Sequence, residues 1–106
     1  MILVNNNLNI EVKNADNFIK KTIGLMFKKN FHYGLKFRCN GIHTFFMREK
    51  IDVVLTDKNN KILYIYPSLK KNKILLPKRY VYYTYEFPDN SVKNLKVGEK
   101  LNIKSD

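Results

Sequence analysis

Three side chains that could take part in binding or catalysis lie in one short aromatic stretch, GIHTFFMREKID, at residues 41–52. They are His43, Arg48 and Asp52. Histidine titrates near neutral pH and serves as a base or metal ligand, and arginine grips carboxylates and phosphates. A carboxylate at the start of an apolar strand must be paired or hydrogen-bonded, because an unpaired buried charge is too costly. The stretch is therefore predicted to form either a small polar ligand site or a turn fixed by local hydrogen bonds.

Each of these residues also has a purely structural interpretation. Asp52 is expected to fix a turn, with a ligand or catalytic role as the alternative. His43 lacks a second ligand at a suitable spacing, since His32 is distant and lies in a basic loop, so a structural or surface histidine is favoured over a metal ligand. Arg48 either neutralises an acidic ligand or faces water. No metal site and no cofactor are predicted.

Glu86 is the second acid of interest, because it lies in an aromatic strand. Along that strand Thr84 and Glu86 share one face, while Tyr83 and Tyr85 share the other. If the strand pairs beside IDVV, Asp52 and Glu86 could approach each other, and two close carboxylates would raise one pKa as acid–base chemistry requires. This pair would support a small hydrolase or lyase.

Length and composition indicate a single domain over residues 1–106. Hydrophobic residues make up 44% of the 106 residues, which suffices for one small core. Cys39 is the only cysteine, so an intrachain disulfide and a multi-cysteine zinc site are excluded; an inert thiol is favoured over a reactive one. The start MILVNNNLNI lacks a charged region before its apolar residues, and no segment is long enough to span a membrane. These features predict a cytoplasmic protein without a membrane partner.

The charge is strongly positive, with 20 Lys and Arg against 9 Asp and Glu, formally +11. Such a field attracts nucleic acid and acidic partners. The excess is spread along the chain and accompanies abundant Asn and Ile, as an AT-rich coding sequence would produce, so its weight as a functional signal is reduced. Four tyrosines beside two cations nevertheless resemble platforms that stack single-stranded bases; these residues are Tyr80, Tyr82, Tyr83 and Tyr85, with Lys78 and Arg79.

Hydrophobic patterning predicts one helix in the first part of the chain, preceded and followed by strands. Residues 8–12 alternate as in a strand with one buried face. Asn14 and Asp16 can cap a helix that ends at Gly24. Residues 34–39 alternate again, and 42–47 form an aromatic run typical of a strand.

The second half predicts a hairpin and two further strands. IDVVLT at 51–56 and KILYIY at 61–66 flank the turn residues DKNN, and Pro67 is expected to end the second strand because proline cannot donate to a ladder. Residues 79–87 predict an aromatic strand, and 95–103 a turn with a short strand. The fold class is therefore α+β and mostly β, a small, largely antiparallel barrel or sandwich with one short N-terminal helix.

The order of these features resembles the bacterial and archaeal family named domain of unknown function 192. The segments that carry the resemblance span residues 8–103: Gly24-Leu25-Met26, GLKF, IHTFFM with Ile51-Asp52, DKNNK, Pro77, Glu86-Phe87-Pro88 and Val97-Gly98-Glu99-Lys100-Leu101. The resemblance implies a small β-rich domain with no established activity. In this chain Glu49-Lys50 replaces the Phe-Pro usual in similar members, and Lys28 replaces an arginine, which loses the fork that grips carboxylates.

Three hypotheses about function follow from the sequence. The leading one is a non-catalytic or accessory binding domain, with a polar site of His43, Arg48, Asp52 and Glu86 that takes a small polar ligand or an acidic partner. The second is a nucleic-acid-binding module, and the third is the carboxylate-pair enzyme. Structural roles are assigned to Gly24, Met26, Met47 and Gly98, and a monomer or weak dimer is expected.

Overall fold

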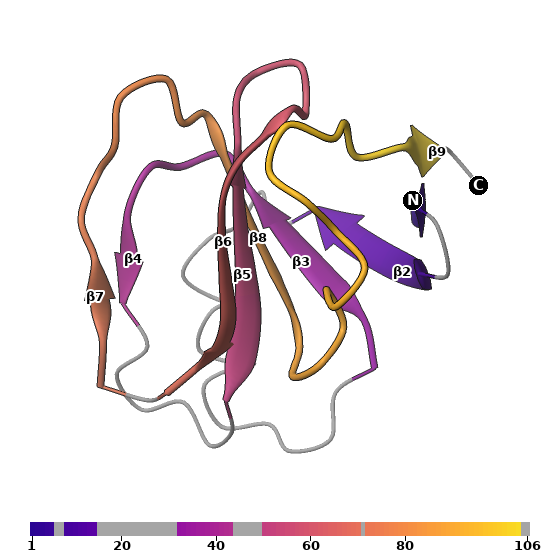
Figure 1. Ribbon diagram of the computed structural model, residues 1–106, viewed down its shortest axis with the longest axis horizontal. Helices are drawn as coiled ribbons and strands as arrows, with labels where there is room; N and C mark the ends of the chain where they lie inside the picture. Colours follow the sequence, from indigo (N-terminus) through magenta and orange to yellow (C-terminus); the bar gives the residue numbers. More distant parts are fainter. Residues whose placement is uncertain (6–7, 15–31, 44–49, 71, 105–106) are drawn as a thin grey trace.

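The computed structural model describes residues 1–5, 8–14, 32–43, 50–70 and 72–104 (Figure 1). For Ile42 and His43 it describes the backbone. This part of the chain contains strands and no helix, so the protein is mostly β there. The predicted helix that ends at Gly24 lies outside the described residues.

Seven strands form one sheet in the order β6-β5-β8-β3-β2-β1-β9, and two more form a separate ribbon, β4-β7. Their bounds are β1 Ile2–Asn5, β2 Leu8–Asn14, β3 Gly34–Phe37, β4 Ile42–His43, β5 Ile51–Thr56, β6 Ile62–Leu69, β7 Ile74–Leu75, β8 Tyr83–Pro88 and β9 Ile103–Lys104. All pairings are antiparallel except that of β2 with β3. The predicted largely antiparallel arrangement is confirmed.

The hairpin β5–β6 forms where the sequence predicts it. In its turn the Asp57 N–H donates to the Lys61 carbonyl, and Asp57 Oδ1 accepts from the N–H groups of Asn59 and Lys61. Asn60 takes a positive φ of 65°, which asparagine tolerates better than most residues. The local turn chemistry is therefore sufficient to set the position of this hairpin.

The expectation that Pro67 ends the second strand of the hairpin is wrong. Ile51 pairs with Leu69 and Val53 pairs with Tyr66, so Pro67 and Ser68 together face a single residue of β5. This two-against-one arrangement is a β-bulge, where proline is tolerated because its missing N–H is not needed by the ladder. Strand β6 therefore continues through the proline to Leu69.

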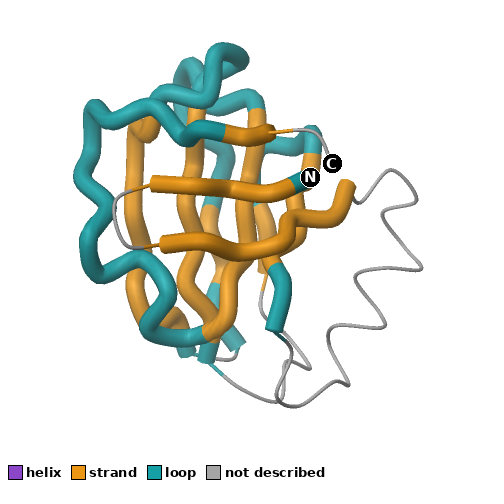
Figure 2. The backbone as a smooth tube through the Cα atoms, turned by 90° about the vertical axis from the view of Figure 1, so that its right-hand side faces the viewer, coloured by secondary structure: helices purple, strands orange, loops and turns teal. Residues whose placement is uncertain are grey.

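The sheet curls until its two ends meet along part of their length (Figure 2). Just before β9, the chain exchanges backbone hydrogen bonds with the start of β6: Gly98 N–H donates to the Ile62 carbonyl at 2.9 Å, and Ile62 N–H donates to the Glu99 carbonyl at 2.8 Å. Gly98 has a φ of +96°, a conformation that favours glycine. The result is a curled half-barrel.

Two apolar cores lie on opposite faces of this sheet. The inner core fills the curl and joins residues from both ends of the sheet: Leu3, Val12, Val54, Ile62, Tyr85, Phe87, Val92, Leu95 and Leu101. The outer core lies on the other face: Leu35, Phe37, Ile51, Val53, Leu55 and Val81. Leu75 of β7 packs against the outer core, so the β4–β7 ribbon helps to cover that face.

The aromatic strand is shorter than predicted, and one further strand is found at the N-terminus. The aromatic strand begins at Tyr83 rather than at residue 79, because Tyr80 has a φ of 69° that interrupts extended backbone. Strand β1 was not predicted at all, since a run of asparagines follows its four residues. Its hydrogen-bonding partners are β2 and the distant β9.

Gly34 offers a direct test of packing between β3 and β8. A Cβ at this position would lie 2.7 Å from both Cδ1 and Cε1 of the Phe87 ring, which is fully buried. We expect Gly34→Ala to lower the free energy of unfolding by about 1–3 kcal/mol, as overpacking does. In a Phe87→Leu background, which removes the outer ring atoms, this loss should shrink. Urea unfolding of the four proteins measures the coupling, and an equal loss in both backgrounds would contradict a steric cause.

Candidate functional site

The structure describes the side chains of Asp52 and Glu86 from the predicted polar site. His43 lies in β4, where its backbone pairs with Ile74 of β7. Arg48 lies outside the described residues, as do Gly24, Met26 and Met47. The geometry of the site can therefore be built from the two acids and their surroundings.

Asp52 is almost completely buried, and both of its carboxylate oxygens accept backbone hydrogen bonds. Ser68 N–H donates to Oδ1 at 2.8 Å, and Val92 N–H donates to Oδ2 at 3.0 Å. Ser68 lies in the bulge of β6, and Val92 lies in the segment after β8. The carboxylate thus supplies acceptors to two N–H groups from different parts of the fold, which is how a buried charge becomes tolerable.

Asp52 and Glu86 do not form a carboxylate pair. Strands β5 and β8 are neighbours, as the pair hypothesis requires, but Asp52 faces Phe87 and Glu86 faces Val53. Because directly opposed residues project to the same face of a sheet and neighbours along a strand alternate, the two carboxyl groups point to opposite faces. The enzyme hypothesis based on this pair is therefore wrong.

Glu86 is buried in the middle of the sheet, on the face of the outer core. It is flanked by Val53 on β5 and by Leu35 on β3, and its residue exposure is 5%. Among the described residues, no hydrogen bond reaches its carboxyl group. Burial raises the pKa of this carboxyl to about 7, against a usual value of 4.5. Glu86 thus titrates within the physiological range.

Cys39 and Thr84 are the polar neighbours of Glu86 on this face. Thr84 Oγ1 donates to the Cys39 carbonyl at 3.1 Å, and Cys39 packs against the outer core. Burial raises the pKa of the Cys39 thiol, and the charge of Glu86 raises it further, while a hydrogen bond with Thr84 opposes the change. The thiol is therefore protonated near neutral pH and reacts slowly, but it lies close enough to Glu86 to respond to its charge.

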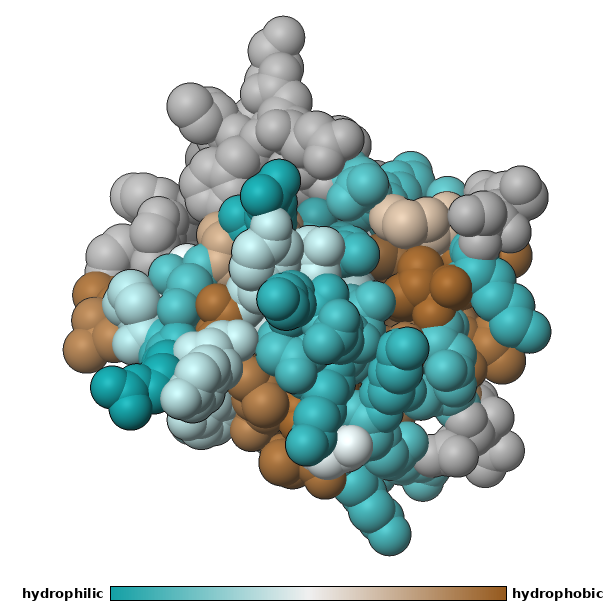
Figure 3. All heavy atoms as spheres, turned by 90° about the horizontal axis from the view of Figure 1, so that it is seen from above, coloured by the Kyte–Doolittle hydropathy of each residue, from teal (hydrophilic) through white to brown (hydrophobic). Residues whose placement is uncertain are grey.

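A basic and aromatic groove lies at the end of the sheet that carries the β5–β6 turn. Its volume is about 550 Å³, and it is lined by Asp57, Lys58, Asn59, Lys61, Leu63, Tyr80, Val81 and Tyr82. We call it the tyrosine groove. Seen from this end, hydrophilic residues occupy the middle of the surface (Figure 3). The tyrosines were noticed in the sequence, but the contribution of the turn depends on tertiary structure.

The described part of the chain lacks two further features. No three His, Cys, Asp or Glu side chains there come together as a metal site. The same residues contain no helix long and apolar enough to cross a membrane.

Substitution of Asp52 tests its hydrogen bonds. In Asp52→Asn one oxygen becomes an NH₂ group, which faces a backbone N–H instead of accepting from it. We expect the free energy of unfolding to fall by about 2–3 kcal/mol, the range for a lost hydrogen bond to a charged group. Asp57→Asn is the control for loss of charge alone, because both N–H bonds of Asp57 go to Oδ1, which remains an oxygen in asparagine, and it should cost about 1 kcal/mol or less. Equal losses in urea unfolding would show that the second accepting oxygen of Asp52 contributes nothing.

Comparison with known proteins supports the resemblance seen in the sequence. The family model DUF192, described as "Uncharacterized ACR", matches residues 1–103. A UPF0127 protein of Pyrococcus horikoshii is 38% identical over 113 aligned positions, which cover 94% of this chain and 96% of the relative. A UPF0127 protein of Pyrococcus furiosus is 38% identical over 102 positions, covering 89% and 87%.

A solved structure confirms the fold. The crystal structure of a protein of unknown function from Novosphingobium aromaticivorans superposes with a TM-score of 0.76 at 13% identity, covering 96% of this chain and 83% of that one. At this identity the likeness concerns the fold alone. With the family model matching nearly its whole length, the chain belongs to the uncharacterised family DUF192, whose curated relatives are named UPF0127 proteins.

Proposed function

We propose that the protein is a non-catalytic binding domain that holds a small ligand against Glu86, on the outer-core face of the sheet. The ligand carries a positive charge or a hydrogen-bond donor. The observation that carries this proposal is a carboxyl group in the centre of the sheet to which no described residue donates a hydrogen bond.

The energetics of Glu86 favour a ligand of this chemistry. A buried carboxylate without a partner loses its hydration and gains nothing in return, which is why the pKa of Glu86 rises. Asp52, on the neighbouring strand, has the same burial but two N–H donors. A bound cation or donor would give Glu86 the compensation that the backbone gives Asp52.

The neighbourhood of Glu86 supplies further contacts for such a ligand. Cys39 lies beside it, and β4 begins three residues later along the chain. We therefore keep His43, the first polar residue of the aromatic stretch, as a contact of the proposed site. Asp52 lies outside the proposed site because it is buried on the opposite face of the sheet from Glu86.

Glu86 suits binding better than catalysis. Two-carboxylate hydrolases need one carboxyl as the acid and a second as the base or nucleophile. Asp52 lies on the opposite face of the sheet from Glu86, so it cannot be that second carboxyl. Its one thiol neighbour is kept protonated rather than activated. We place the domain in the cytoplasm, where a single free cysteine is stable.

The pH dependence of stability tests the state of Glu86. Folding raises the pKa of Glu86. Its contribution to the free energy of unfolding is therefore fully present below pH 4.5 and is lost as pH rises through about 7. Glu86→Gln cannot ionise, so the unfolding free energy of the variant minus that of the parent should increase by about 2–3 kcal/mol from pH 5 to pH 8. Taking the difference removes the effect of the other carboxylates. A difference that stays constant across this range would show that Glu86 ionises normally.

A thermal-shift screen at pH 8 tests ligand binding. The probes are Mg²⁺, Mn²⁺, Zn²⁺, spermidine, arginine and neutral sugars, applied to the parent, Glu86→Gln and Glu11→Gln. Glu11 is an exposed acid on β2, so its variant matches the change in charge. We expect a cationic probe to raise the unfolding midpoint of the parent and of Glu11→Gln but not of Glu86→Gln.

Alkylation of Cys39 provides a second readout of the same site. This is the only thiol in the chain, and a ligand beside Glu86 should slow its reaction with iodoacetamide. A probe that raises the midpoint of Glu86→Gln as much as that of the parent, without protecting Cys39, binds elsewhere and would refute the proposed site.

A further inference from the structure

We infer that the tyrosine groove binds single-stranded nucleic acid, with bases against its rings and phosphates along its cations. This site lies apart from Glu86, at the end of the sheet formed by the β5–β6 turn and residues 80–82. It stands independently of the function proposed above, because it uses none of the same residues.

The ring of Tyr80 is exposed to solvent and belongs to neither apolar core. Its exposure is 77%, the largest of any described large hydrophobic or aromatic residue, and its φ of 69° is rare for an aromatic residue. Val81, the next residue, is buried in the outer core and Tyr82 N–H bonds to the Thr56 carbonyl at 2.8 Å. The backbone around Tyr80 is thus fixed while most of the ring stays exposed to solvent.

Cations lie over the rings of Tyr80 and of two other tyrosines. The Arg79 guanidinium carbon is 5.9 Å from the centre of the Tyr80 ring, and the Lys78 amine is 5.4 Å from that of Tyr64. The Arg38 guanidinium carbon is 5.1 Å from the centre of the Tyr82 ring. These contacts orient the rings without neutralising the charges, so each ring lies beside an intact positive group.

The lining of the groove is itself basic. Lys58 and Lys61 are exposed, and the acid among the lining residues is Asp57. Oδ1 of Asp57 accepts two N–H bonds from its own turn. Together with Lys78 and Arg79, the groove therefore has a clear excess of positive charge that complements a phosphate backbone.

The geometry favours a single strand over a duplex. Bases in a duplex are already stacked on each other, so an exposed tyrosine ring gains a partner only where bases are unpaired. A groove of about 550 Å³ has the size of a small-molecule pocket rather than of a duplex groove. Stacking and charge on one concave surface are the two components of single-strand recognition.

The test is fluorescence anisotropy with labelled oligouridylate and oligothymidylate of about 12 nucleotides, which is within the usual site size. We expect the parent to bind at physiological salt. Tyr80→Ala should weaken binding roughly 5- to 100-fold, the range for loss of one stacking ring, whereas Tyr80→Phe retains the ring and should bind like the parent. Circular dichroism confirms that each variant is folded, as expected for so exposed a residue.

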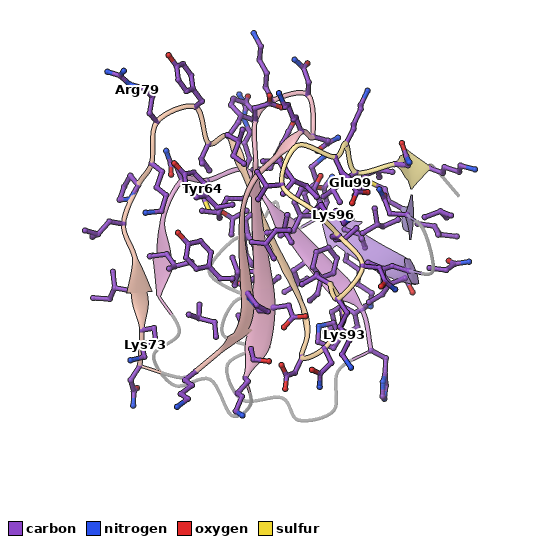
Figure 4. The ribbon with its side chains drawn as sticks, viewed as in Figure 1. Tyr64, Lys73, Arg79, Lys93, Lys96 and Glu99 are labelled. Carbon is purple, nitrogen blue, oxygen red and sulfur yellow. The ribbon has the colours of Figure 1, made fainter. Side chains whose placement is uncertain are left out.

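Charge in the groove is tested by Lys58→Gln/Lys61→Gln. This double variant should reduce the slope of log affinity against log salt by about 1.4, which corresponds to two phosphate contacts. The control is Lys93→Gln/Lys96→Gln, which removes the same charge from exposed positions outside the groove. Figure 4 shows Arg79, beside the groove, at the opposite end of the molecule from Lys93.

Three outcomes would overturn the inference. One is the absence of binding by either oligonucleotide to the parent at physiological salt. Another is an equal loss of affinity in the two double-lysine variants, which would mean that net charge alone attracts the strand. The third is equally tight binding of a duplex of the same length, unaffected by Tyr80→Ala, since stacking would then contribute nothing.

Discussion

The carboxylate of Asp52 holds together three segments on which the rest of the structure depends. Strand β5 carries it, the bulge of β6 donates through Ser68, and the segment after β8 donates through Val92. The bulge turns the Ser68 N–H out of the ladder, where Asp52 Oδ1 accepts from it. Val92 belongs to the inner core, so the second bond also positions a residue that closes the curl. An acidic residue at the entrance of a buried strand is thus a consequence of the bulge.

The contrast between Asp52 and Glu86 shows how one residue of register places two neighbouring acids in different surroundings. Both acids are buried on neighbouring strands, yet one has two backbone donors and the other has none among the described residues. A fold selected for stability alone would replace such a glutamate with an apolar residue, because Val53 and Leu35 flank it. Retaining a carboxyl there costs stability above neutral pH, and a site that binds a donor or cation explains that cost.

Local features of the sequence predicted what local chemistry controls. The residues at 57–60 located the hairpin, alternation located β2 and β3, and aromatic content located β8, each within a few residues. Pro67 was misread because the bulge that accommodates it depends on β5, and β1 was missed because its partners include β9 at the other end of the chain. The pairing of β5 with β8 was a condition of the carboxylate-pair hypothesis, and the structure meets that condition. The sequence could not give the register of the two strands, and a shift of one residue decides whether two side chains share a face.

The positive charge of the chain has a structural role that coding bias alone does not explain. With 20 cations and 9 acids, most cations cannot form ion pairs, and the described part of the chain places several over tyrosine rings instead. Lys36 lies 4.1 Å from the centre of the Tyr83 ring, and burial lowers its pKa, so this contact is partly buried. An aromatic ring stabilises a cation without cancelling its charge. Where such rings are exposed, as at Tyr80, the surface keeps both an aromatic area for stacking and a positive electrostatic field. An unpaired nucleic-acid strand requires these two properties together.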